Sequence, residues 1–336
     1  MITGIGSLPF TDVDEAIDLI FNKCPEIPFW PQLPRRSKLE NMYVPFLDGV
    51  PFFYIDDIGN VYPRVDDGED WEEFLIHLTE EKVQSFAIRK ELIPGFYRLL
   101  ERIEEIESSV KAVKTQITGP ISMAMGIKDK RGLPIIYDDF FFGILKKTIN
   151  MKARWMVFEI KNRLPSKEVI LFFDEPYLVA YGSSYLSLPQ DQLISALNEA
   201  FYQIDAKIGI HCCGNTDWSL VLRSNADIIN YDAYNFLENI FLFREDLERF
   251  LERKGTISPG IVPSTDDIKE ITQEKIKEIL CRFLDEFSKI KPFEKELNIL
   301  ITPSCGLGNL SSEDAKKAMA LLANVPKILS EIFDKQ

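Results

Sequence analysis

A histidine and two cysteines stand together near the middle of the chain. The apolar run 206–210 is typical of a buried strand, and His211, Cys212 and Cys213 follow it directly, before a Gly-Asn pair at which the chain must turn. Side chains alternate between the two faces of a strand, so we expect His211 and Cys213 on one side and Cys212 on the other. Zinc binds imidazole nitrogen and thiolate sulfur, so His211 and Cys213 form half of a candidate metal site.

A third soft ligand stands in a similar position near the end of the sequence. The apolar run 299–301 leads into a turn that carries Cys305, whereas Cys281 lies inside a helical pattern and Cys24 follows one. The competing interpretation is a buried core histidine beside a buried thiol. We prefer zinc because the chain has only two histidines and because two separate strand ends carry soft ligands. The other histidine, His77, is expected on a helix surface.

The elements that must position these ligands alternate between strands and helices. Eight strands are expected, at residues 1–6, 51–55, 110–117, 169–173, 206–210, 226–230, 255–258 and 297–301. Strand-helix alternation indicates a parallel sheet, and eight such units without a low-complexity linker predict a single (β/α)₈ TIM barrel over residues 1–336. The active sites of such barrels lie at the carboxyl ends of the strands, where His211, Cys213 and Cys305 are expected. The proline-rich segment 25–49 is expected to be an irregular loop insertion.

Carboxylates also follow the expected strands. Asp174 and Glu175 come after the fourth strand, and a pair of carboxylates there could bind an ammonium group. Asp232 follows the sixth strand and could be a fourth zinc ligand, a hydrogen-bond partner of a ligand or a solvated loop residue. The glycine-rich turn 4–9 would let the backbone approach a bound ligand closely.

The composition limits the partners and the location of the protein. A formal net charge of -14 argues against nucleic acid, because binding to a phosphate backbone depends on clustered lysine and arginine. No apolar run reaches the roughly 18 residues that cross a bilayer, so we expect no membrane partner and a cytoplasmic location. Five cysteines, two of them adjacent, do not indicate a disulfide framework, and a reducing compartment would leave them available to a metal.

Five short motifs resemble one known family when they are taken together. In chain order they are Gly4-Ile5-Gly6-Ser7-Leu8-Pro9, Gln116-Ile117-Thr118-Gly119-Pro120, Phe173-Asp174-Glu175-Pro176, His211-x-Cys213 and Ser304-Cys305-Gly306-Leu307. They resemble the successive signatures of the catalytic half of cobalamin-independent methionine synthase. Its broader relatives are uroporphyrinogen decarboxylase-like methyltransferases, which move methyl groups from corrinoid proteins to thiols. The resemblance implies a TIM barrel in which His211, Cys213 and Cys305 hold a catalytic zinc and a thiol, homocysteine above all, enters the coordination sphere.

The resemblance also implies a site for the amino-acid part of homocysteine. It assigns substrate contacts to Asp174 and to the backbone of Ile5, Gly6 and Ser7, and Glu40 matches a further glutamate of the family. We add Glu175 as the neighbour of Asp174. The synthases carry a glutamate zinc ligand after the sixth strand, where this chain has Asp232.

The methyl donor is expected to be a methyl-corrinoid and not a methylated folate. The folate-using synthases carry a further N-terminal barrel that we expect this chain to lack, and the acidic net charge disfavours a polyglutamate tail. A corrinoid protein would then be the partner, and segment 25–49, with Phe29, Trp30, Arg35 and Arg36, is either its docking edge or a lid that packs over the barrel without meeting a partner. The alternatives are a methyltetrahydrofolate-type donor, a decarboxylase of the uroporphyrinogen type that needs no zinc, and a zinc-binding protein without catalysis.

Overall fold

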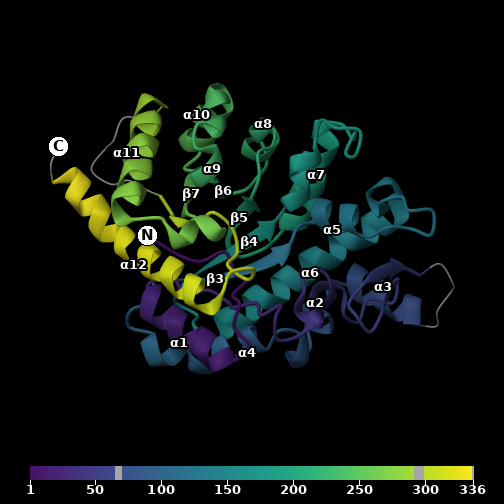
Figure 1. Ribbon diagram of the computed structural model, residues 1–336. Helices are drawn as coiled ribbons and strands as arrows, with labels where there is room; N and C mark the ends of the chain where they lie inside the picture. Colours follow the sequence, from purple (N-terminus) through teal and green to yellow (C-terminus); the bar gives the residue numbers. More distant parts are fainter. Residues whose placement is uncertain (65–69, 291–298, 335–336) are drawn as a thin grey trace.

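A six-stranded parallel sheet forms the centre of the molecule. The computed structural model describes residues 1–64, 70–290 and 299–334 (Figure 1). The strands neighbour one another in chain order: β3 (Ala112–Thr118), β4 (Glu168–Asp174), β5 (Lys207–Cys212), β6 (Ile228–Asp232), β7 (Thr256–Val262) and β8 (Thr302–Pro303). Nearly all of their residues are buried, as expected for strands that are covered on both faces.

Helices surround the strands (Figure 1). The longer ones are α1 (Val13–Lys23), α3 (Asp70–Thr79), α4 (Pro94–Arg102), α6 (Asp139–Arg163), α7 (Gln190–Phe201), α10 (Arg244–Glu252), α11 (Gln273–Ile290) and α12 (Ser312–Phe333). The shorter ones are α2 (Val44–Leu47), α5 (Pro120–Gly126), α8 (Trp218–Leu222) and α9 (Ala233–Phe236). Asp12 and Ser311 cap α1 and α12 by accepting hydrogen bonds from backbone N–H groups of the first turn, which satisfies donors that a helix leaves free. Among the described residues, no helix combines the length and the apolar character needed to cross a membrane.

The expected second strand, at residues 51–55, is not part of the central sheet. β1 (Phe53–Ile55) instead pairs antiparallel with β2 (Val61–Pro63) in a separate two-stranded sheet. The position beside β3 belongs to segment 27–32, where Phe29 makes an isolated parallel bridge with Lys114. The prediction of a barrel strand at residues 51–55 is therefore wrong, and so is the description of the whole of segment 25–49 as an irregular insertion.

Two short segments lie between the edge strands β8 and β3. Residues 2–7 bridge to Ile301, directly before β8, and residues 27–32 bridge to β3, and the two segments bridge to each other between Ser7 and Gln32. Their backbone hydrogen bonds are few and include Thr3 N–H to Ile301 O at 3.0 Å and Gln32 N–H to Gly6 O at 3.1 Å. The TIM-barrel prediction is confirmed in part, as a curled parallel sheet of six strands with helices around it.

The aromatic side chains of segment 27–32 face the interior. Phe29 and Trp30 are 1% and 0% exposed. The ring of Trp30 packs edge-on against Phe46 and Phe96, with centroids 6.3 and 5.9 Å away. The expectation that these two aromatics form an exposed docking edge is wrong, because they are part of the hydrophobic core.

Candidate metal centre

The structure brings together the three soft ligands that the sequence singles out. His211 is the penultimate residue of β5, Cys213 follows that strand, and Cys305 follows β8. One ligand atom from each of the three lies within 4.8 Å of the other two. Cys212 points away from this group and is fully buried, as the alternation of side chains along a strand requires. A nitrogen and two sulfurs at this spacing match the ligand set of a tetrahedral zinc site.

A buried asparagine fixes the orientation of the histidine. Asn230, on β6, lies in register with His211, and its Oδ1 pairs with His211 Nδ1. Its Nδ2 faces the backbone oxygen of Ser258 at 2.8 Å, which can only accept, so Oδ1 is the atom turned to the imidazole. His211 Nδ1 must then carry the proton that it donates to Asn230. The other nitrogen, Nε2, is buried without a hydrogen-bond partner, so in the neutral ring its lone pair is available to a metal ion.

The two thiols shift each other's pKa in opposite directions. The pKa of Cys213 is lowered to about 4, because the thiol of Cys305 and the ring of His211 both stabilise its negative sulfur. The pKa of Cys305 is raised well above its ordinary value, because it donates to Cys213 and is buried. Burial by itself lowers the pKa of His211, but the nearby sulfur of Cys213 and the nearby Asp174 raise it overall. The arrangement therefore favours a negative sulfur beside a positive ring, a charge distribution that a bound cation can replace.

Asp174 lies at the same level as the ligands, on the neighbouring strand. It ends β4 and is in register with Thr118 on one side and His211 on the other. Its Oδ1 is buried and has no hydrogen-bond partner. Burial raises the pKa of this carboxyl, while the charges of His211 and Lys114 act in the opposite direction. A buried carboxylate oxygen without a partner is available for a positively charged part of a ligand.

Glu175 uses its carboxylate to hold a helix. Oε1 accepts from Ile121 N–H at 3.0 Å and Oε2 accepts from Ser122 N–H at 2.6 Å, both in the first turn of α5. A side chain on Gly119 would overlap the same carboxylate, so the glycine makes room for it. Burial raises the pKa of Glu175 to about 7, although hydrogen bonds from Ser122 and Ile121 lower it. Its expected contact with substrate stays a prediction, since both oxygens have partners within the protein.

Asp232 is likewise engaged within the protein. Its Oδ1 accepts from the backbone N–H of Asn235 at 2.9 Å and its Oδ2 accepts from the side chain of Asn235 at 2.7 Å, so it caps α9. Asp232 does not belong to the group of His211, Cys213 and Cys305. A role as fourth zinc ligand would require it to release at least one of these hydrogen bonds.

The turn expected to contact substrate is fastened to the loop that carries Cys305. The carbonyl of Ser7 accepts from Leu307 N–H at 2.9 Å, and its hydroxyl accepts from Gly308 N–H at 3.4 Å. Gly6 has a φ of +152°, and a side chain there would overlap the amide of Gln116. The carbonyl of Ile5 accepts from the side chain of Lys114. The structure thus places the turn of Ile5, Gly6 and Ser7 next to the third metal ligand.

Glu40 is a buried acid with one free oxygen. It is 1% exposed, its Oε1 pairs with Arg36, and its Oε2 has no hydrogen-bond partner. Burial raises the pKa of Glu40 to about 6 against the effect of Arg36. The side chain of Gln32 donates to the carbonyl of Glu40 at 3.1 Å, which fastens this residue to segment 27–32.

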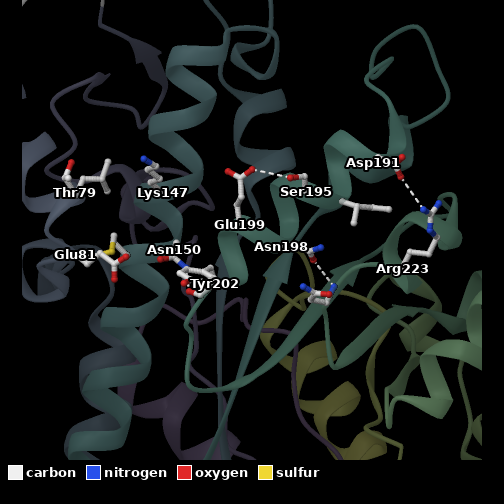
Figure 2. A pocket seen from close by; sticks show the side chains of 14 residues that line it. Thr79, Glu81, Lys147, Asn150, Asp191, Ser195, Asn198, Glu199, Tyr202 and Arg223 are labelled. Atoms are coloured by element: carbon white, nitrogen blue, oxygen red, sulfur yellow. Dashed lines mark hydrogen bonds and ion pairs between the residues drawn. The ribbon is translucent and has the colours of Figure 1, made fainter.

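A large cavity elsewhere on the molecule is not part of this site. It measures about 790 Å³ and is lined by residues of α6 and α7, among them Lys147 and Ser195 (Figure 2). None of the three metal ligands lines it. Two of its acidic side chains have partners, because Asp191 pairs with Arg223 at 3.2 Å and Glu199 accepts from Ser195 at 3.3 Å.

Comparison with known proteins gives likeness in structure only. No protein-family model and no curated protein matches the sequence. A B12-independent methionine synthase from Shewanella sp. W3-18-1, solved in complex with selenomethionine, aligns over 99% of this chain and 98% of its own, with a TM-score of 0.56 and 16% identity. A methyltransferase from Methanosarcina mazei aligns over 97% of this chain and 94% of its own, with a TM-score of 0.60 and 13% identity. At these identities the likeness shows a shared fold.

Proposed function

We propose that this chain is a zinc-dependent methyltransferase that moves a methyl group to a small thiol, with homocysteine as the preferred acceptor and methionine as the product. The observation that carries the proposal is the group of His211, Cys213 and Cys305, whose ligand atoms lie within 4.8 Å of one another. The unpartnered, buried Nε2 of His211 fits a metal and has no other evident use. The two aligned structures, one a methionine synthase and one a methyltransferase, support the same reaction class.

The protein's own residues prepare the acceptor. Zinc at this site would supply positive charge that lowers the pKa of an acceptor thiol, which is ordinarily about 8.5. His211, Cys213 and Cys305 would hold the zinc, and the acceptor sulfur would complete its set of ligands. Asn230 keeps His211 in the tautomer that can bind. The acceptor sulfur then forms its bond to the methyl carbon as the bond from that carbon to the donor breaks, and the donor keeps the electron pair.

The remainder of the site would select and align the acceptor. The free Oδ1 of Asp174 suits the ammonium group of an amino-acid thiol, and the backbone of residues 5–7 lies beside Cys305. Such positioning raises the rate because the reacting atoms are held close and in line. We also infer that segments 2–7 and 27–32 take the positions of the first two strands in a closed eight-stranded barrel around this site.

We propose a methyl-corrinoid as the donor, with a methyltetrahydrofolate-type donor as the alternative. A methyl-corrinoid was expected from the charge and the length of the chain. The aligned methionine synthase is described as B12-independent, which keeps a methyltetrahydrofolate-type donor as the alternative. Both donors should therefore be compared directly, methylcobalamin against methyltetrahydrofolate.

One experiment tests the proposal as a whole. Purified protein would be analysed for metal and then assayed with each methyl donor and a panel of thiols. We expect zinc in stoichiometric amount and methyl transfer to homocysteine. Protein without zinc that decarboxylates a porphyrinogen would favour the decarboxylase alternative, and zinc without transfer from either donor would favour a binding protein.

A second experiment tests the acceptor. Asp174→Asn keeps the size of the side chain and removes its charge. We expect the KM for homocysteine to rise about tenfold or more, the size of a lost hydrogen bond between charged groups, while the zinc content stays constant. Equal methylation of a thiol without an amino group by both proteins would confirm that the contact is specific to the ammonium. An unchanged KM for homocysteine would exclude this role.

A further inference from the structure

A lysine is buried completely within the sheet, below the metal centre. Lys114, in the middle of β3, is 0% exposed. Its Nζ donates to the carbonyl of Ile5 and to Oε1 of Gln116, the latter at 3.0 Å, and lies 4.8 Å from the ring centroid of Phe172. Burial lowers the pKa of Lys114 to about 7, against the effect of Asp174. Lysine is rarely buried to this extent, because its charge must leave water.

The carbonyl that Lys114 binds, that of Ile5, lies in a segment that pairs only irregularly with the sheet. Ile5 lies in segment 2–7, which joins its neighbours by isolated bridges and not by a continuous ladder. In a regular strand, a neighbouring backbone N–H would donate to the Ile5 carbonyl. Because this carbonyl is buried without such a neighbour among the described residues, it needs another donor, and Lys114 provides it. Gln116, two residues further on the same strand, acts in the same way on the other segment, because its Nε2 donates to the carbonyl of Trp30 at 3.2 Å.

Ile5 is the first residue of the turn that is expected to contact the acceptor. The same turn continues through Gly6, whose backbone fits closely against Gln116, to Ser7, which is bonded to the loop after Cys305. Lys114 and Gln116 therefore fix the turn from below while the Cys305 loop fixes it from the side. Neither residue belongs to the metal-ligand group.

We propose that Lys114 is a positioning residue of the acceptor site: it holds the Ile5 carbonyl and thereby the turn 5–7, and so determines the preference for an amino-acid thiol over a simple thiol. This inference rests on the proposed methyl transfer to a thiol. The sulfur of either thiol would be placed by the metal, but only the amino-acid part of homocysteine would use the turn. Loss of Lys114 should accordingly affect the two acceptors unequally.

The test compares two buried lysines. Lys114→Met keeps an unbranched side chain of similar length and removes the donor. The matched control is Lys152→Met, because Lys152 on α6 is also buried, donates to a backbone carbonyl, that of Asp48, at 2.9 Å, and has its pKa lowered by burial to about 8. Zinc content, and KM and kcat for homocysteine and for 2-mercaptoethanol, would be measured for both variants and for the wild type.

We expect Lys114→Met to retain zinc and to raise the KM for homocysteine about tenfold or more, as for the loss of a hydrogen bond from a charged donor. The KM for 2-mercaptoethanol should change less than about twofold, within the ordinary effect of a substitution outside a binding site. Lys152→Met should leave both values at the wild-type level. Equal changes for the two thiols, or none, would overturn the inference.

Amide hydrogen exchange gives a readout that needs no activity. Loosening of the turn should speed exchange at Thr3 and Leu8, whose N–H groups donate to Ile301 and Gln32, in Lys114→Met and not in Lys152→Met. If Lys114→Met does not fold, Lys114→Gln removes the charge with a polar side chain and should show the same selectivity. Wild-type protein that methylates neither thiol would defeat the proposed function, whereas unchanged exchange would defeat the role of Lys114 alone.

Discussion

The regular strands β3 to β7 and the two short segments 2–7 and 27–32 meet at the metal centre, but they are held in place in different ways. From β3 to β7 the strands pair over long registers, such as the one that runs from Ala112 beside Glu168 to Thr118 beside Asp174. Residues 2–7 and 27–32 make isolated bridges, and the side chains of Lys114 and Gln116 donate hydrogen bonds to their carbonyl groups. Two metal ligands come from the first part and the expected backbone contacts to substrate from the second. Metal binding and acceptor recognition should therefore be separable by mutation.

The largest effect is expected for the ligands themselves. Replacing His211, Cys213 or Cys305 by alanine leaves two protein ligands, too few for a stable zinc site, so bound zinc should fall from about one ion per chain to almost none and activity should be lost. Metal analysis after gel filtration would measure this. Cys281→Ala is the control, because this cysteine lies on α11 outside the ligand group, and it should leave the zinc content unchanged.

The next effect is expected at Asn230, within the regular part. Asn230→Leu removes the acceptor that holds the Nδ1 proton of His211, and loss of such a partner typically weakens metal binding about 10- to 100-fold. Competition with a chromogenic chelator would measure the zinc affinity. The KM for the acceptor, measured at saturating zinc, should stay near the wild-type value. A variant that lost acceptor affinity and kept zinc affinity would contradict the separation of the two parts.

The corresponding change in the irregular part is Gly6→Ala. The φ of +152° is unfavourable for alanine, and its methyl group would overlap the amide of Gln116, so the turn must move. We expect the KM for homocysteine to rise about tenfold, equivalent to about 1.4 kcal/mol, with zinc affinity unchanged. Gly49→Ala is the matched control, since Gly49 also has a positive φ, +73°, but no atom lies within 4 Å of the added carbon.

The smallest effect on the KM for the acceptor is expected for Glu175→Gln, which should instead change the pH dependence of stability. Because burial raises the pKa of Glu175 to about 7, the folded protein holds this proton to a higher pH than the unfolded chain does. Its contribution to stability is present below pH about 4.5 and is lost as the pH rises through about 7. Relative to the glutamine variant, the wild type should lose up to about 3 kcal/mol of unfolding free energy between pH 4.5 and 8. Urea unfolding at several pH values would measure the difference, and a large change in KM would instead support direct contact with substrate.

The metal ligands could be found from the sequence because their signal is local. Alternation along a strand fixes the sides of His211 and Cys213, and the position of Cys305 after an apolar strand puts it at the same edge of a parallel sheet. Asn230 was missed. A buried asparagine inside a strand that follows the histidine strand was the available signal, but its meaning depends on the register between β5 and β6, which a single sequence does not reveal.

The second strand was misplaced because of prolines. Segment 27–32 contains Pro28 and Pro31, which have no N–H to donate, so its composition is typical of a loop. Its buried aromatics, Phe29 and Trp30, and the side-chain donors of β3 hold it in a strand position that local propensity does not favour. Residues 53–55 have the composition of a strand and form one, but they pair with the nearby residues 61–63.

The contacts of the first residues have a consequence for the order of folding. Met1 and Thr3 bond to Ile299 and Ile301, almost the full chain length away, and Ser7 bonds to Leu307. Contacts over such separations are entropically costly to close and form late, so the amino-terminal segment must wait during synthesis until residues 299–307 have left the ribosome. Cys305 arrives with them. We expect metal capture and closure of the acceptor turn to be one late event, so that a nascent chain halted before this point would hold neither zinc nor thiol.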